Sequence, residues 1–181
     1  MSGVRGHFSV THRVIHWLMA AAILAMLFIG VGMVSTVSAR YLTLVSIHKP
    51  LGIAILVLAL LRIVVRLRHG TPGLPADLPA PMRLAAAASH YAFYALMVAM
   101  PLLGWGMLSA AGYPVQLLPG VTLPAVLPQS DALHTALWNA HRTLAFVFFA
   151  LILLHVAAAL FHLLVRRDGV FQAMTAGPTE P

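Results

Sequence analysis

The sequence predicts an all-α membrane protein, a bundle of four transmembrane helices with both termini in the cytoplasm. Of the 181 residues, 61% are hydrophobic and only 8% are charged, whereas about a quarter of a soluble domain is charged. Apolar segments long enough to cross about 30 Å of hydrocarbon occur four times along the chain. The basic residues lie beside these segments, and most of them fall on one side of the membrane.

The four helices are expected over residues 14–34, 45–65, 84–108 and 133–165, within a single domain that covers residues 1–181. The connection at 66–83 is rich in proline and glycine, which interrupt helices and suit a surface linker. The connection at 109–132 contains four prolines and is mildly apolar. We therefore expect this second connection to lie along the membrane interface.

The distribution of basic residues sets the orientation. One side of the membrane receives eight of them, namely Arg5, Arg13, Arg62, Arg66, Arg68, Arg83, Arg166 and Arg167. The opposite side has Arg40, Lys49 and Arg142. Because cytoplasmic segments carry the excess of Lys and Arg, both termini are placed in the cytoplasm. The net charge of +7 is spread along the helix ends, which suits anionic lipid headgroups and not nucleic acid.

The composition also restricts the cofactor. The chain contains no cysteine, which excludes disulfides, thiolate-ligated iron–sulfur clusters and the covalent attachment of c-type haem. A metal-ion transporter would place carboxylates beside its histidines inside the membrane. Only Asp131 approaches a span, at its edge. A histidine-rich transporter without haem nevertheless remains an alternative.

Histidines inside the spans are the most informative feature of the sequence. His141 and His155 are 14 residues apart, about 40° short of four whole turns, so they share one helix face about 21 Å apart. A b-type haem needs two axial ligands from opposite sides. His48 lies level with His141 near the outer surface, and His16 lies on the same side as His155. Geometry alone would also admit His90 in place of His16.

Further basic side chains and histidines lie near the ends of the spans. Arg13, Arg62, Arg66 and Arg142 lie where haem propionates would emerge, although contact with lipid phosphates would explain them equally well. We interpret His134 and His162 as interfacial groups or as neighbours of the ligands. The remaining histidines, His7, His12 and His69, are expected to be solvated.

In combination, these residues resemble the bacterial cytochrome b561 family of four-helix di-haem membrane cytochromes. The resemblance covers nearly the whole chain. It rests on residues 13–18 (RVIHWL), on His48 followed by Gly52, on residues 61–67 (LRIVVRL), on Thr71-Pro72, on His90 with Tyr94, Pro101 and Gly104, and on His141 with His155.

The resemblance implies a set of expectations. The axial ligands of two haem b groups would be His16, His48, His141 and His155, which leaves His90 and His162 as neighbours of the haems or as quinone contacts. The location would be the bacterial inner membrane, and electrons would pass between the outer side and ubiquinone. Family members of this size include superoxide oxidases, so superoxide:quinone oxidoreductase activity is expected. The alternative is a cytochrome b anchor that relays electrons between quinone and a separate periplasmic redox partner.

Overall fold

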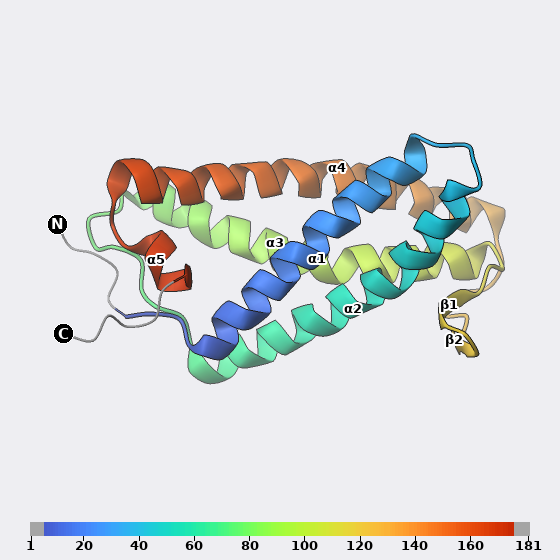
Figure 1. The fold of residues 1–181 in the computed structure, drawn as a ribbon, viewed down its shortest axis with the longest axis horizontal. Coiled ribbons are helices and arrows are strands. Elements are labelled where there is room, and N and C mark those ends of the chain that lie inside the picture. The colour runs from blue at the N-terminus through green and yellow to red at the C-terminus, as the bar shows by residue number, and fades with distance from the viewer. Residues whose placement is uncertain (1–5, 176–181) are drawn as a thin grey trace.

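The protein is represented by a computed structural model that describes residues 6–175; residues 1–5, with Arg5, and residues 176–181 lie outside the described part. Four long helices dominate it: α1 (Val10–Val34), α2 (Arg40–His69), α3 (Ala80–Ala110) and α4 (Asp131–Phe161) (Figure 1). Each is long and apolar enough to cross a membrane, which confirms the predicted bundle of four transmembrane helices; the predicted orientation of the termini stays a prediction. Each also begins before its expected first residue, because helical hydrogen bonding continues beyond the purely apolar stretch.

Two helix starts are fixed by serine caps. The Ser9 side chain accepts a hydrogen bond from the backbone of His12 at the start of α1, and Ser130 does the same for Leu133 at the start of α4. Such caps satisfy amides that have no partner within the helix. Pro50 lies inside α2 and Pro101 inside α3, so neither proline ends its helix.

The helices form two antiparallel pairs. α1 packs along α2 and α3 packs along α4, while contacts between α2 and α3 join the pairs (Figure 1). We call the end where α1 begins and α4 finishes the inner end, and the opposite end, with β1 and β2, the outer end. Numerous large apolar side chains are exposed, for example Phe28 at 77% and Leu154 at 67%. Such a surface suits a lipid environment.

A small apolar core lies midway along the bundle. Every transmembrane helix contributes to it, through Met19, Ala59, Leu96, Met97 and Phe148. Phe148 lies seven residues from both His141 and His155 on α4. The core therefore separates an outer level of the bundle from an inner level.

The outer connection contains a strand pair that the sequence analysis did not expect. It forms an antiparallel hairpin of β1 (Val115–Leu118) and β2 (Val121–Leu123). Gly120 adopts a positive φ of 78° in the turn between the strands, a conformation that glycine tolerates best. Lys49 donates a hydrogen bond to the Pro114 carbonyl at 3.3 Å and so ties the hairpin to α2.

The chain after α4 folds back over the inner end of the bundle. A π-helical turn, η1 (His162–Arg166), leads into the short helix α5 (Val170–Thr175). The Phe8 amide donates to the Ala173 carbonyl at 3.1 Å, and the Trp17 indole donates to the Met174 carbonyl at 3.3 Å. These bonds hold α5 against the start of α1.

Candidate functional site

The outer level of the bundle brings His48 of α2 and His141 of α4 face to face. Their ring centroids are 6.2 Å apart, with an angle of 61° between the ring planes. Both rings are half-buried, and the Nδ1 atom of each is buried without a hydrogen bond of good geometry. The Met100 backbone lies close enough to the His141 ring to interact with it. Gly104 lies beside the His141 ring: a Cβ built on it would be in ordinary van der Waals contact, 3.5 Å from His141 Cε1.

The inner level brings together three histidines. His155 of α4 lies 6.3 Å from His16 of α1 and 6.4 Å from His90 of α3, measured between ring centroids. Phe93 also contacts His155, with centroids 5.0 Å apart. His16 is half-buried, whereas His90 is exposed. The spacing therefore admits either partner for His155, and the choice of His16 stays a prediction from family resemblance.

The spacing of the paired rings can be compared with what a shared metal requires. Two imidazoles on opposite sides of one metal ion, each bound at about 2.0 Å, place their ring centres about 6.3 Å apart. The observed separations are 6.2 Å for His48 and His141 and 6.3 Å for His16 and His155. The four side chains thus fit axial ligation of two haem irons at two depths.

Arginines converge on the inner level. Arg62 Nη1 donates a hydrogen bond of 2.8 Å to His16 Nδ1, and Arg62 also lies within hydrogen-bonding reach of the Tyr94 hydroxyl. The Arg66 guanidinium lies 5.4 Å from the centre of the Tyr94 ring, a cation–π distance. Arg13 is half-buried. Arg142 is exposed beside His141 at the outer level.

Buried polar atoms without a partner gather in these same two places. Across residues 6–175 they belong to the outer histidines and to three basic side chains of the inner level: His48 Nδ1, His141 Nδ1, His12 Nε2, Arg13 Nε and Arg62 Nε. Buried polar groups in folded proteins almost always have a partner. Their concentration marks two places at which a bound group would complete the structure.

His12 is the residue that the sequence analysis placed wrongly. We expected it to be solvated, but its exposed fraction is only 3%. It lies one helical turn before His16, with Phe8 and His69 against its ring. Ser9 three residues earlier, and His16 four residues later, are the sequence signals that would have identified it as a capped, inward-facing residue. His7 and His69 are exposed, as expected.

His162 pairs with an acidic residue that the sequence analysis did not single out. Its Nδ1 lies 2.8 Å from Asp168 Oδ2, and Arg166 Nε donates to the same oxygen at 2.9 Å. Arg166 also reaches Asp77 at 3.1 Å. Burial opposes ionisation of Asp168, but the hydrogen bonds from Arg166 and His162 outweigh burial and hold the pKa of Asp168 below its usual value. At the outer end, His134 Nδ1 lies 2.9 Å from the Met107 carbonyl, so that ring joins α4 to α3.

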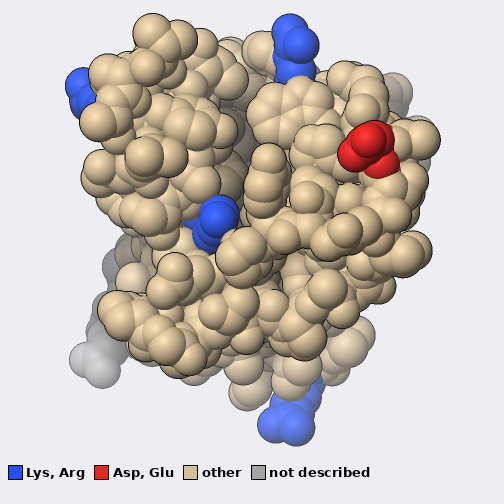
Figure 2. All heavy atoms as spheres, turned by 90° about the vertical axis from the view of Figure 1, so that its right-hand side faces the viewer, with Lys and Arg blue, Asp and Glu red and all other residues tan. Residues whose placement is uncertain are grey.

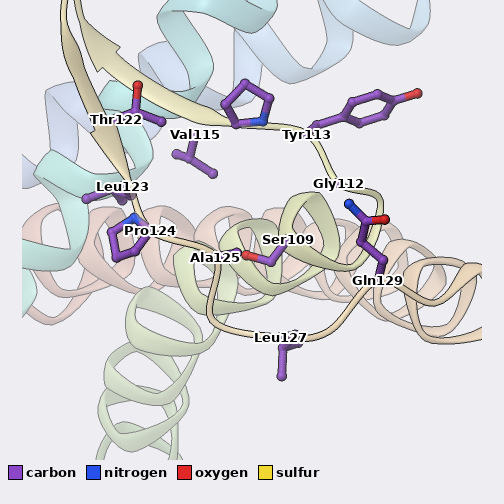
Figure 3. Close-up of a pocket in the computed structure, with 11 residues that line it drawn as sticks. Ser109, Gly112, Tyr113, Val115, Thr122, Leu123, Pro124, Ala125, Leu127 and Gln129 are labelled. Atoms are coloured by element: carbon purple, nitrogen blue, oxygen red, sulfur yellow. The ribbon is translucent and has the colours of Figure 1, made fainter.

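A separate pocket of about 280 Å³ lies beneath the hairpin. Figure 3 shows Ser109 and Val115 directed into it, with Gln129 at one side. Ser109 Oγ already donates to the Trp105 carbonyl and accepts from the Val126 amide. None of the lining residues is charged. The pocket therefore presents no charged group and no free Ser109 hydroxyl.

The surface of the outer end carries few charges. Figure 2 shows a mostly uncharged face with separate basic side chains and one acidic patch. A furrow enters this face, and a basic side chain lies at its lower end (Figure 2). The connection at 111–130 contributes no Lys or Arg.

Facing imidazole pairs at two levels of a four-helix membrane bundle are typical of membrane cytochromes that hold b-type haem between helices. The chain belongs to the prokaryotic cytochrome b561 family, whose family model matches residues 7–177. It is therefore a membrane electron-transfer protein of a family that binds b-type haem.

Curated relatives support the same conclusion. Cytochrome b561 homolog 1 of Escherichia coli strain K12 is 29% identical over 175 residues, which span 92% of this chain and 96% of the relative. Cytochrome b561 homolog 2 of the same strain is 29% identical over 170 residues, 92% of this chain and 90% of the relative. The protein named probable superoxide oxidase CybB of Yersinia pestis is 34% identical over 129 residues, 71% of this chain and 72% of the relative.

Proposed function

We propose that this protein is a di-haem b cytochrome of the bacterial inner membrane that passes electrons from superoxide on the outer side to ubiquinone. One observation carries the proposal. Two pairs of histidines, at two levels of the bundle, hold their ring centroids 6.2 and 6.3 Å apart. That separation is suited to a metal between each pair.

The outer haem would be held by His48 and His141, and the inner haem by His16 and His155. When bound, haem supplies one-electron redox chemistry, while the protein sets its ligation, spacing and surroundings. Because each iron would have two histidine ligands, no position is left for oxygen. Arg13, Arg62 and Arg66 would contact propionates at the inner level, and Arg142 would do so at the outer level.

Ligation at His16 requires one rearrangement. A neutral histidine that accepts a hydrogen bond at Nδ1 carries its proton on Nε2. Arg62 donates to His16 Nδ1, so the lone pair needed at Nε2 becomes available only when this contact is replaced. Arg62 has the Tyr94 hydroxyl within reach as another partner. Release of Arg62 from His16 would also free its guanidinium to pair with a propionate.

The overall reaction balances as two superoxide anions, one quinone and two protons giving two dioxygen molecules and one quinol. The name of the Yersinia relative supports superoxide as the donor. Lys49 and Arg142 directly follow the two outer histidines in sequence. Together with Arg40, they would raise the encounter rate with a small anion. Quinone would bind near the inner level, where His90 is exposed and His162 is paired with Asp168.

A second function has its own supporting observation. The outer face is mostly uncharged, and the hairpin connection carries no basic residue. Such a face suits contact with a separate periplasmic redox protein better than capture of superoxide. In this case the chain would be an anchor that relays electrons between that partner and quinone.

Stopped-flow spectroscopy on the purified protein tests the proposal. Under the superoxide hypothesis, superoxide reduces both haems rapidly, and added ubiquinone speeds their reoxidation. Superoxide dismutase should abolish the reduction. Slow reduction by superoxide, together with rapid reduction by a co-purifying protein, would favour the relay. A colourless protein without reduced-minus-oxidised haem bands would refute both functions.

A further inference from the structure

We propose that His12 is a hydrogen-bond donor to a carboxylate bound at the inner level, and that this carboxylate is a propionate of the inner haem. The inference rests on the proposed haem ligation and adds His12 and Ser9 to it. His12 is buried to 97%, as its exposed fraction of 3% shows. Its Nε2 atom is nonetheless without a partner.

The hydrogen bonds of Ser9 determine which nitrogen of His12 carries the proton. Ser9 Oγ accepts from the His12 backbone amide at 3.3 Å and lies 3.0 Å from His12 Nδ1. The hydroxyl proton of Ser9 needs an acceptor, and Nδ1 of His12 is the acceptor that lies within hydrogen-bonding distance of it. The neutral His12 ring then carries its proton on Nε2. His12 thus presents a buried donor that lacks an acceptor.

The neighbours of this donor exclude a cation as its ligand. Arg13 Nε and Arg62 Nε are also buried donors without a partner. The charges of Arg62 and Arg66 act on His12 as well. A metal cation would be repelled by these side chains and would find no lone pair on Nε2. An anion beside His12 Nε2 would accept its hydrogen bond and offset the nearby charge of Arg62.

The position of His12 relative to His16 identifies the anion. The two residues are four apart on α1, which places them on one face with His12 about 6 Å nearer the inner end. The cluster therefore lies beside the proposed inner ligand, on the side where propionates would emerge. A lipid phosphate has the same chemistry and could fill the same donors. Burial of His12 beneath Phe8 and against His69 favours the propionate, because a headgroup would need an open approach.

The test measures the reduction potentials of both haems in His12 variants of the purified holoprotein. His12→Phe keeps a ring of similar size but removes the donor, whereas His12→Gln keeps an amide donor near the Nε2 position. Loss of the donor destabilises the reduced, more negative haem. We expect the equilibrium constant for reduction of the inner haem to fall by up to about tenfold in His12→Phe, because the propionate charge that His12 offset would act more strongly on the reduced haem than on the oxidised haem. His12→Gln should restore most of it.

Several controls make the outcome decisive. The outer haem serves as an internal standard and should keep its potential, and His7→Phe should change neither haem. If His12→Phe does not accumulate, Ser9→Gly removes the hydroxyl that fixes the proton, and glycine is well tolerated at a helix N-cap. This variant should lower the same potential by less.

Unchanged potentials in a variant that binds both haems would overturn the inference and leave the proposed function intact. Constant potentials together with a fall in bound phospholipid phosphate per protein would also overturn the inference, because the anion at His12 would then be a lipid phosphate. The proposed function would again remain intact. A wild-type protein that lacks haem would overturn the proposed function itself.

Discussion

Each level of the bundle contains a facing pair of histidines, but the side chains around the two pairs differ. At the outer level, His48 and His141 face each other with buried, unpartnered Nδ1 atoms. At the inner level, His155 has two possible partners, and Arg62 occupies the Nδ1 atom of one of them. The outer site is thus specified by its two histidines alone. At the inner site, His155 has two possible histidine partners and Arg62 contacts one of them, so the histidines alone do not specify the ligand pair.

The two levels also differ in the charges that a bound group would meet. A group at the outer level would meet few charges, with Lys49 bound to the Pro114 carbonyl of the hairpin connection. A group at the inner level would meet Arg13, Arg62 and Arg66 together with His12. Positive surroundings stabilise a reduced haem. We therefore expect the inner haem to have the higher potential, which would favour electron flow from the outer side inward.

The largest effect is expected from removal of one outer ligand. His141→Ala should reduce the haem content from two per chain to one, because His48 alone cannot complete the coordination of iron. The pyridine haemochrome assay measures the content, and the remaining haem should have the inner potential. His134→Ala on the same helix is a matched control that should keep both haems. Retention of two haems in His141→Ala would disprove the outer assignment.

The next prediction distinguishes the two partners of His155. His16→Ala should lose the inner haem, whereas His90→Ala should retain both haems with at most a small spectral shift. Low-temperature reduced spectra of the two variants give the comparison, since they resolve the inner and outer haems. The opposite result, with loss in His90→Ala, would assign His90 as the ligand. In that case His16 would not bind iron and would only accept the hydrogen bond from Arg62.

The sequence predicted the helices and the histidine pairs because both follow from regular geometry. Fourteen residues of helix bring His141 and His155 to one face, and neighbouring helices at equal depth supply His48 at the outer level and His16 or His90 at the inner level. The environment of His12 and the ion pairs of Asp168 could not be predicted in this way. Both depend on how α5 and the chain before α1 fold back onto the bundle. Such contacts arise from loops, which carry no periodic signal.

The Asp168 network gives a moderate effect restricted to the inner end. Asp168→Asn should lower the free energy of unfolding by about 1–2 kcal/mol, because Arg166 and His162 lose a charged hydrogen-bond partner. Thermal unfolding in detergent measures the change, and Asp131→Asn at the outer start of α4 is the matched control. The folded-state pKa of Asp168 is lowered, so its contribution is present above about pH 4 and is lost as the pH falls through that lowered pKa. Asp168→Asn should lack this acid-dependent part. Equal stability of the variant and the parent at pH 7 would contradict the prediction.

The smallest effect is expected at Gly104, which lies beside the outer histidine His141. Gly104→Ala adds a Cβ that would lie 3.5 Å from His141 Cε1, an ordinary van der Waals contact. Both haems should therefore remain, with only a slight shift in the spectrum of the outer one. Gly30→Ala on α1 is the contrasting variant: apart from its own helix backbone, nothing lies within 4 Å of its added Cβ, so it should leave both spectra unchanged. A change at the inner haem in Gly104→Ala would show that the two levels are coupled through α3. The apolar core between them would then not insulate one site from the other.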